Sequence, residues 1–280
     1  MAGAIDAWVN PFTPDLQRRL VDDEEVGAVI KWWHMEDRYK GFTPEEVIAL
    51  MDEAGLDKIL IAAFQMYSFM RKVPIVAYTT EEIAEVVKTR PDRFAGLYGV
   101  NPYKRMQAVR ELEVAVKEYG FKGAHIHTYG FGLPIDAPDY YPIYAKCVEL
   151  GVPVEMQIGH SAEAMPSDMG RPIRLDNIAL YFPELKLVAA HTGWPWCEEL
   201  VALSWKHPNI YISTSAHAPK YWDKTIVDFI NTRGQGKVMW ATDWPVVPWK
   251  ESIEQIEALG LKERAKQLLL HDVAAEVFKL

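Results

Sequence analysis

The chain has 280 residues, of which 49% are hydrophobic and 25% charged, a composition typical of a globular protein with its own core. Its formal net charge of −9 argues against general nucleic-acid binding, which needs a basic surface. The sequence lacks a signal-peptide pattern and any run near the roughly 18 apolar residues of a membrane span, so we expect a cytoplasmic protein. The two cysteines, Cys147 and Cys197, lie in apolar or aromatic surroundings and are expected to be reduced.

Short apolar segments alternate with longer amphipathic segments along the whole chain, without a linker or a shift in composition. This alternation is typical of βαβ units, in which each buried strand is followed by a helix. One helical segment ends at Gly55, which suits the left-handed position that closes a helix. Strands are expected at residues 4–9, 58–64, 94–100, 121–127, 152–158, 185–190, 209–215 and 237–241, and two helices at 252–280.

Eight parallel strands with intervening helices predict a single (β/α)8 barrel (a TIM barrel, fold class α/β) that spans residues 1–280. Several strands are nearly continuous apolar runs, as expected for strands buried on both faces. The alternative is an open doubly wound sheet, but no glycine-rich phosphate loop follows the first strand. The long insertion after the first strand includes the polar and aromatic segment KWWHMEDRYKG, residues 31–41, which we interpret as a lid over the active site.

Polar side chains at the C-terminal ends of barrel strands are the candidates for catalysis. A single histidine there is more often a structural residue, so the argument depends on several strands providing such groups at one end. His125 and His127 have i, i+2 spacing, which places both imidazoles on one side of a strand, where they could hold a metal. The full set comprises Trp8, Asn10, His125, His127, Glu155, Gln157, His160, His191, Ser213, Ser215, His217 and Asp243.

Six segments together resemble the amidohydrolase-related group of metal-dependent barrels (amidohydrolase family 2), which includes lactonases, hydratases and nonoxidative decarboxylases. They are IDAWVN, GFKGAHIHTYG, ELGVPVEMQIGH, LKLVAAHTGWPW, HPNIYISTSA and VMWATDWPVVP, and they span nearly the whole chain. The resemblance implies that His191 and Asp243 are catalytic, as an acid/base pair or as metal ligands. It adds His127 as a third catalytic candidate, because the family often has a histidine at that position after the fourth strand.

The sequence departs from the family pattern at the expected metal site. The family usually begins with Asp-x-His-x-His, but here Trp8 and Asn10 replace both histidines, and Gln157 stands where a strand-five histidine is common. Tryptophan cannot bind a metal, and amide oxygens are poor ligands for zinc. If a divalent metal such as zinc is bound, we expect His191 and Asp243 as ligands, with His125 or His127; otherwise we expect no cofactor.

The resemblance favours a hydrolase that attacks the carbonyl of a small cyclic ester or a related aromatic or carboxylate compound. The alternatives are a nonoxidative decarboxylase or hydratase on the same scaffold, and a noncatalytic binding protein on a degenerate barrel. Arg71, Lys72, Arg171 or Arg174 could receive a substrate carboxylate. We expect a small-molecule substrate, neither nucleic acid nor membrane as partner, and a homodimer as the common assembly of such enzymes. The expected substrate-binding residues are Trp8, Asn10, His125, Gln157, Trp194 and Trp244.

Overall fold

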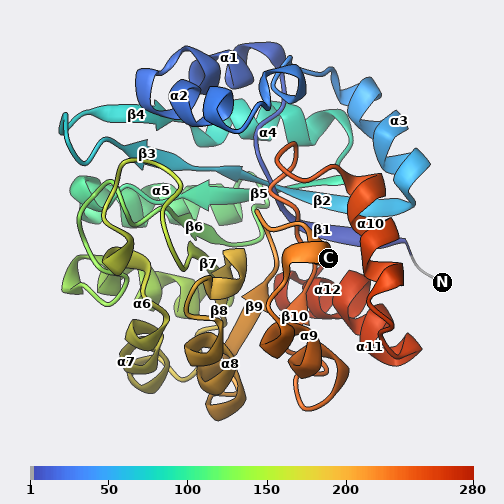
Figure 1. Cartoon of the computed structure of the whole chain (residues 1–280). Helices are drawn as coiled ribbons and strands as arrows, with labels where there is room; N and C mark the ends of the chain where they lie inside the picture. Colours follow the sequence, from blue (N-terminus) through green and yellow to red (C-terminus); the bar gives the residue numbers. More distant parts are fainter. Residues whose placement is uncertain (1–2) are drawn as a thin grey trace.

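The computed structural model describes residues 3–280, and its central feature is one sheet of eight parallel strands ringed by helices (Figure 1). The strand order is β1-β2-β5-β6-β7-β8-β9-β10, so each strand pairs with the next barrel strand along the chain. All eight expected strands are present, although most are shorter than the sequence suggests. They are β1 (Ala4–Val9), β2 (Leu56–Ala63), β5 (Phe94–Gly99), β6 (Ala124–Ile126), β7 (Val154–Gln157), β8 (Leu187–Ala190), β9 (Ile210–Ser213) and β10 (Val238–Met239).

The sheet closes on itself between β1 and the segment that follows β10. The backbone N–H of Ala7 donates to the carbonyl of Trp240 at 3.1 Å, and the N–H of Asp243 donates to the carbonyl of Trp8 at 3.1 Å. A parallel bridge between Val9 and Trp244 completes this contact. The first and last strands therefore meet, and the expected TIM barrel is confirmed.

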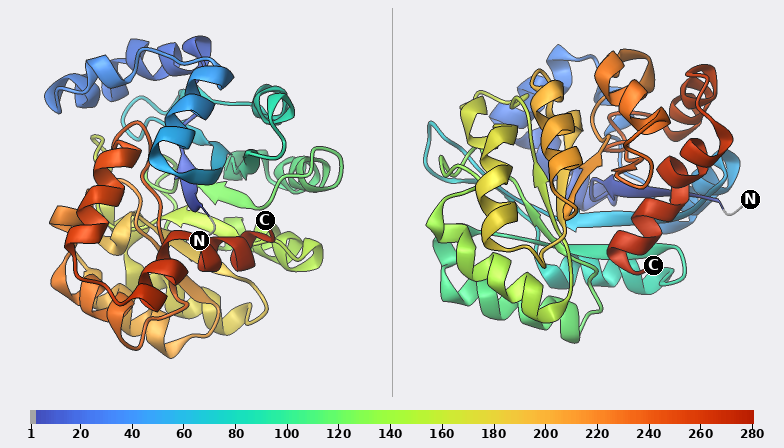
Figure 2. Two further views of the ribbon diagram at one scale, coloured as in Figure 1. Left: turned by 90° about the vertical axis from the view of Figure 1, so that its right-hand side faces the viewer. Right: turned by 90° about the horizontal axis from the view of Figure 1, so that it is seen from below.

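The helices lie outside the barrel and cover the outer face of the strands (Figure 2). Strands β5 and β8 are buried along their whole length, as the apolar runs in the sequence predict. The end of helix α3 at Gly55 is also confirmed, since this residue has φ = 74° and closes the helix. The helices are α1 (Pro14–Asp22), α2 (Glu24–Trp32), α3 (Pro44–Ala54), α4 (Thr80–Thr89), α5 (Met106–Lys117), α6 (Tyr141–Leu150), α7 (Leu175–Tyr181), α8 (Cys197–Lys206), α9 (Lys224–Asn231), α10 (Trp249–Ala258), α11 (Glu263–Gln267) and α12 (Val273–Phe278).

Two parts of the fold differ from the sequence expectation. After β2 the chain forms an antiparallel hairpin of β3 (Gln65–Tyr67) and β4 (Pro74–Ala77), which the apolar pattern did not reveal because both strands are short. The C-terminal region contains three helices rather than two, with a π-helical turn at Leu268–Asp272 between α11 and α12. Among residues 3–280 no helix has the length and apolar character needed to cross a membrane.

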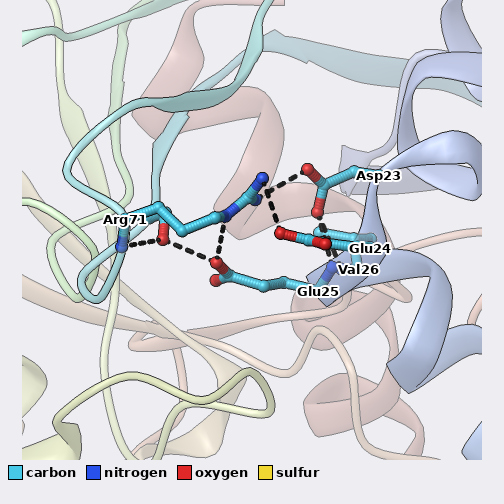
Figure 3. A network of polar contacts seen from close by, with 6 residues as sticks. Asp23, Glu24, Glu25, Val26 and Arg71 are labelled. Atoms are coloured by element: carbon cyan, nitrogen blue, oxygen red, sulfur yellow. Dashed lines mark hydrogen bonds and ion pairs between the residues drawn. The ribbon is translucent and has the colours of Figure 1, made fainter.

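The insertion after β1 forms α1 and α2, which lie beside the β3–β4 hairpin at the top of Figure 1. Arg71, at the tip of this hairpin, joins the two parts through three carboxylates at the start of α2 (Figure 3). Its guanidinium lies 2.9 Å from Asp23, 3.1 Å from Glu24 and 2.7 Å from Glu25. Asp23 also caps α2 by accepting from the N–H groups of Glu25 and Val26. Arg71 therefore holds the insertion in place, and it does not point into a substrate site as the sequence suggested.

Candidate active site

A cavity of about 530 Å³ opens at the C-terminal ends of the barrel strands, where barrel active sites form. The strand ends contribute Trp8, Asn10, Phe64, Gln157, His191 and Asp243. The insertion contributes Leu20, Val26, Val29, Ile30, Trp33, Met35 and Tyr39, which agrees with its interpretation as a lid. Strand β3 contributes Met66, and the segments after the barrel strands contribute Tyr129, His160, Ala162, Glu163, Trp194, Ala216, His217, Tyr221 and Val246. Within the described part of the chain, none of these cavity-lining residues is a lysine or an arginine.

Trp8 lies at the base of this cavity, on the inward face of β1. Its ring stacks on that of His125, with 5.1 Å between centroids and 9° between planes, and lies 5.1 Å from the ring of His191. Only 2% of Trp8 is exposed, and its indole Nε1 has no hydrogen-bond partner among residues 3–280. A flat aromatic surface therefore lies at the C-terminal end of β1, beside His125 and His191.

Asp243 follows β10 and is held by Asn10 from β1. Asn10 Nδ2 donates to Asp243 Oδ1 at 2.7 Å, and no residue among 3–280 donates to Oδ2. Burial raises the pKa of Asp243 well above its usual value, while the hydrogen bond from Asn10 opposes this shift. This shift favours the protonated form of the carboxyl group. The backbone of Asp243 is left-handed, with φ = 58°, a strained conformation that is common at functional sites.

His191 follows β8 and is oriented by Ser215, from the end of β9. Ser215 Oγ accepts from the backbone N–H of His191 at 3.1 Å and lies 2.9 Å from its Nδ1. Burial, and then the neighbouring imidazoles of His217, His125 and His127, lower the pKa of His191 well below its usual value. The ring is therefore neutral, and its backbone is also left-handed, with φ = 64°.

The structure brings His191 and Asp243 to the same cavity, but it does not pair them as an acid/base couple in which the aspartate orients the imidazole. The imidazole is oriented by Ser215, and the carboxyl group is oriented by Asn10. The two groups thus act as separate elements of the site.

Three of the expected site residues do not line the cavity. His125 is fully buried against Trp8, and burial lowers its pKa to about 3. His127 is also fully buried, and the ring of Tyr129 meets it edge-on with 5.5 Å between centroids. Trp244 points away from the cavity and stacks on Trp249, with 4.7 Å between centroids. The position of these three residues outside the cavity lining does not support direct contact with a substrate there.

Four polar residues that line the cavity had no role assigned from the sequence: His160 and His217 were only strand-end candidates, and Glu163 and Tyr39 were not among the candidates. His160 and His217 follow β7 and β9, and their rings lie 4.7 Å and 6.2 Å from the ring of Trp194. The position of these histidines after strand ends was the available signal. Glu163 lies in a loop that carries no recognisable pattern, and Tyr39 lies in the insertion that the sequence marked only as a lid.

The other cations considered as carboxylate receptors are engaged elsewhere. Arg171 forms a salt bridge with Glu199 at 2.6 Å, and Arg174 binds Asp136 and Asp168 on the protein surface. Lys72 lies over the ring of Phe69, 3.9 Å from its centroid. A substrate carboxylate in this cavity would therefore meet imidazoles and amides rather than a permanent positive charge.

The side chains present do not fit a divalent metal. Within residues 3–280 no group of three His, Cys, Asp or Glu side chains is arranged to hold an ion. Asn10 presents its N–H group to Asp243, and the same Nδ2 also donates to the carbonyls of Asp243 and Trp244 at 3.1 Å and 3.2 Å, so its amide oxygen cannot take that place. His125, the third ligand expected from the sequence, is buried against Trp8.

The chain is similar to characterised decarboxylases along most of its length. It is 24% identical to a gamma-resorcylate decarboxylase of Rhodococcus jostii over 324 aligned positions, which cover 96% of this chain and 91% of the relative. This similarity favours the decarboxylase alternative over the hydrolase reading.

Solved structures confirm the fold. A TIM-barrel protein of Bordetella bronchiseptica superposes with a TM-score of 0.77 at 22% identity, covering 99% of this chain and 98% of that one. A 5-carboxyvanillate decarboxylase of Novosphingobium aromaticivorans gives 0.75 at 19% identity, covering 99% and 96%. The latter structure contains manganese, not the zinc that we expected of a metal-dependent member. The family model described as amidohydrolase matches residues 5–280, and this chain therefore belongs to the amidohydrolase family.

Proposed function

We propose that this protein is a lyase that removes carbon dioxide from a small aromatic or conjugated carboxylic acid. The observation that carries the proposal is a fully buried carboxyl group, Asp243, in a largely apolar cavity whose lining, within residues 3–280, has no lysine or arginine. The similarity to decarboxylases along the chain supports the same reaction class.

Nonoxidative decarboxylation breaks the bond between the carboxylate carbon and the adjacent carbon, which keeps the electron pair and must receive a proton. Asp243 is suited to supply this proton because burial raises its pKa, which favours the protonated form, and because no residue among 3–280 donates to its Oδ2. After the transfer, Asn10 Nδ2 stabilises the new carboxylate through its hydrogen bond to Oδ1. A proton from solvent then restores the acid, so that one carboxylate and one proton yield one CO2 and one C–H bond.

His191 is suited to act as a hydrogen-bond donor to the substrate. Ser215 Oγ already accepts from the backbone of His191, and its own proton can be donated to Nδ1. In this arrangement the single ring proton of the neutral imidazole lies on Nε2. The Nε2–H group can then orient a carboxylate, carbonyl or hydroxyl oxygen of the substrate.

The walls of the cavity favour loss of the carboxylate charge. Trp8, Phe64 and Trp194 present rings on which a planar substrate can stack. A carboxylate enclosed by such walls loses hydration and gains no compensating cation, whereas CO2 is uncharged. The site therefore destabilises the reactant relative to the product.

The test is CO2 release from a panel of hydroxybenzoates, beginning with 2,6-dihydroxybenzoate, with one solvent deuterium expected at the carbon that loses its carboxylate. Asp243→Asn should lower kcat about 100-fold or more, because the amide has no acidic proton. His271→Gln, outside the cavity, is the matched control and should keep full activity. Hydrolysis of small lactones without CO2 release would replace this proposal with the hydrolase reading.

A further inference from the structure

We propose that this chain works without a resident divalent metal, and that Trp8 and Asn10 are the residues that keep such an ion out of the barrel mouth. The inference concerns metal binding alone, so it does not depend on the reaction or the substrate. It distinguishes this chain from the related manganese-containing structure described above.

Trp8 occupies the space that an ion beside His191 would need. Its ring lies 5.1 Å from that of His191 and is packed in parallel against His125 on another side. The side chain is 98% buried by these contacts, so it has no room to move aside. The indole also offers no lone pair to a metal, and its N–H group can only donate.

Asn10 places a hydrogen-bond donor where a ligand would be needed. Its Nδ2 contacts three oxygens, namely Asp243 Oδ1 at 2.7 Å, the carbonyl of Asp243 at 3.1 Å and that of Trp244 at 3.2 Å. Three acceptors around one nitrogen fix the orientation of the amide. One oxygen of Asp243 is thereby occupied, and the Asn10 oxygen faces away from it.

The remaining acidic side chain at this end of β1 is also fully used. Asp6 accepts from the backbone N–H of Trp8 at 3.1 Å, from the N–H of Thr242 at 3.0 Å and from Trp249 Nε1 at 2.7 Å. The hydroxyl of Thr242 provides a fourth donor. Asp6 therefore joins β1 to the segment after β10 and has no free oxygen for an ion.

Elemental analysis of protein purified without chelator from medium supplemented with manganese and zinc tests the first part. We expect well under one tenth of an equivalent of either metal, and no loss of the free Mn²⁺ signal in electron paramagnetic resonance when protein is added. About one equivalent of tightly held metal would overturn the inference. This outcome would leave the decarboxylation assay unaffected, so the two proposals can fail separately.

The double variant Trp8→His, Asn10→His tests the second part. It should bind Mn²⁺ at least about tenfold more tightly than the matched control Trp8→Phe, Asn10→Ala, because it restores two imidazole ligands beside His191 and Asp243. Circular dichroism verifies that both variants are folded. Equal, weak binding by two folded variants would show that these residues do not exclude the metal, and would overturn that assignment.

Discussion

Replacement of Trp8 tests how the base of the cavity is built, because the buried ring and its unpaired N–H group act in opposite directions. Trp8→Ala should lower the free energy of unfolding by about 3–5 kcal/mol, as expected when a buried aromatic side chain leaves a cavity. Stacking on His125 contributes about 0.5–1.5 kcal/mol within such losses. Trp8→Phe keeps one ring and loses only roughly 1 kcal/mol of apolar burial.

Trp8→Phe also removes an N–H group that is buried without a partner among residues 3–280, a defect worth about 1–3 kcal/mol. The phenylalanine variant should therefore lie within about 1 kcal/mol of the wild type, whereas the alanine variant should be several kcal/mol less stable. Urea unfolding followed by far-ultraviolet circular dichroism at pH 7 measures both values. Equal destabilisation by the two substitutions would refute the reasoning, since it would mean that the indole N–H has a partner or that ring packing contributes little.

Three further predictions concern the lid and the histidines. Arg71→Met should raise KM several-fold with little change in kcat, because it frees the start of α2 from the β3–β4 hairpin. An unchanged KM would show that the ion pairs of Arg71 do not affect substrate binding. Ser215→Ala should lower kcat about tenfold, because the orientation of His191 is lost, while a change confined to KM would contradict this role. Burial, and then the neighbouring His160, lower the pKa of His217 to about 4. Between about pH 6.5 and 4 the unfolded chain therefore binds a proton at this residue that the folded chain does not bind. The free energy of unfolding consequently falls as the pH is lowered through that window. His217→Asn should make the loss of unfolding free energy between pH 7 and pH 4.5 smaller by at most about 3 kcal/mol, as measured by urea unfolding at both pH values. An unchanged loss in this variant would assign the acid sensitivity to other groups.

The barrel could be predicted from the sequence because its signals are local. Apolar runs such as residues 94–100 and 185–190 mark strands buried on both faces, and amphipathic segments between them mark the covering helices. The short β3 and β4 escaped prediction because three or four residues carry too little alternation to be distinguished from a loop.

The site could be predicted only in part, because alternation along a strand gives the face of a side chain but not its depth. His125 does point inward, but the register pairs it with Glu155, two residues below Gln157, so it lies in a deeper layer under Trp8. His127 lies above His125 and is covered by Tyr129. The side chain after Asp243 turns outward, which places Trp244 among the helices.

By itself, the amino-acid sequence determined the eight-strand barrel, and it predicted a site at the C-terminal ends of the strands and a metal site altered at Trp8 and Asn10. Those conclusions depend on residue type and on periodicity, which act within one strand or helix. Only the tertiary structure decided that Asn10 orients Asp243, that Ser215 orients His191 and that, among residues 3–280, no lysine or arginine lines the cavity. These contacts join residues far apart in the chain. They depend on how neighbouring strands are staggered, and this stagger is fixed only when the barrel closes.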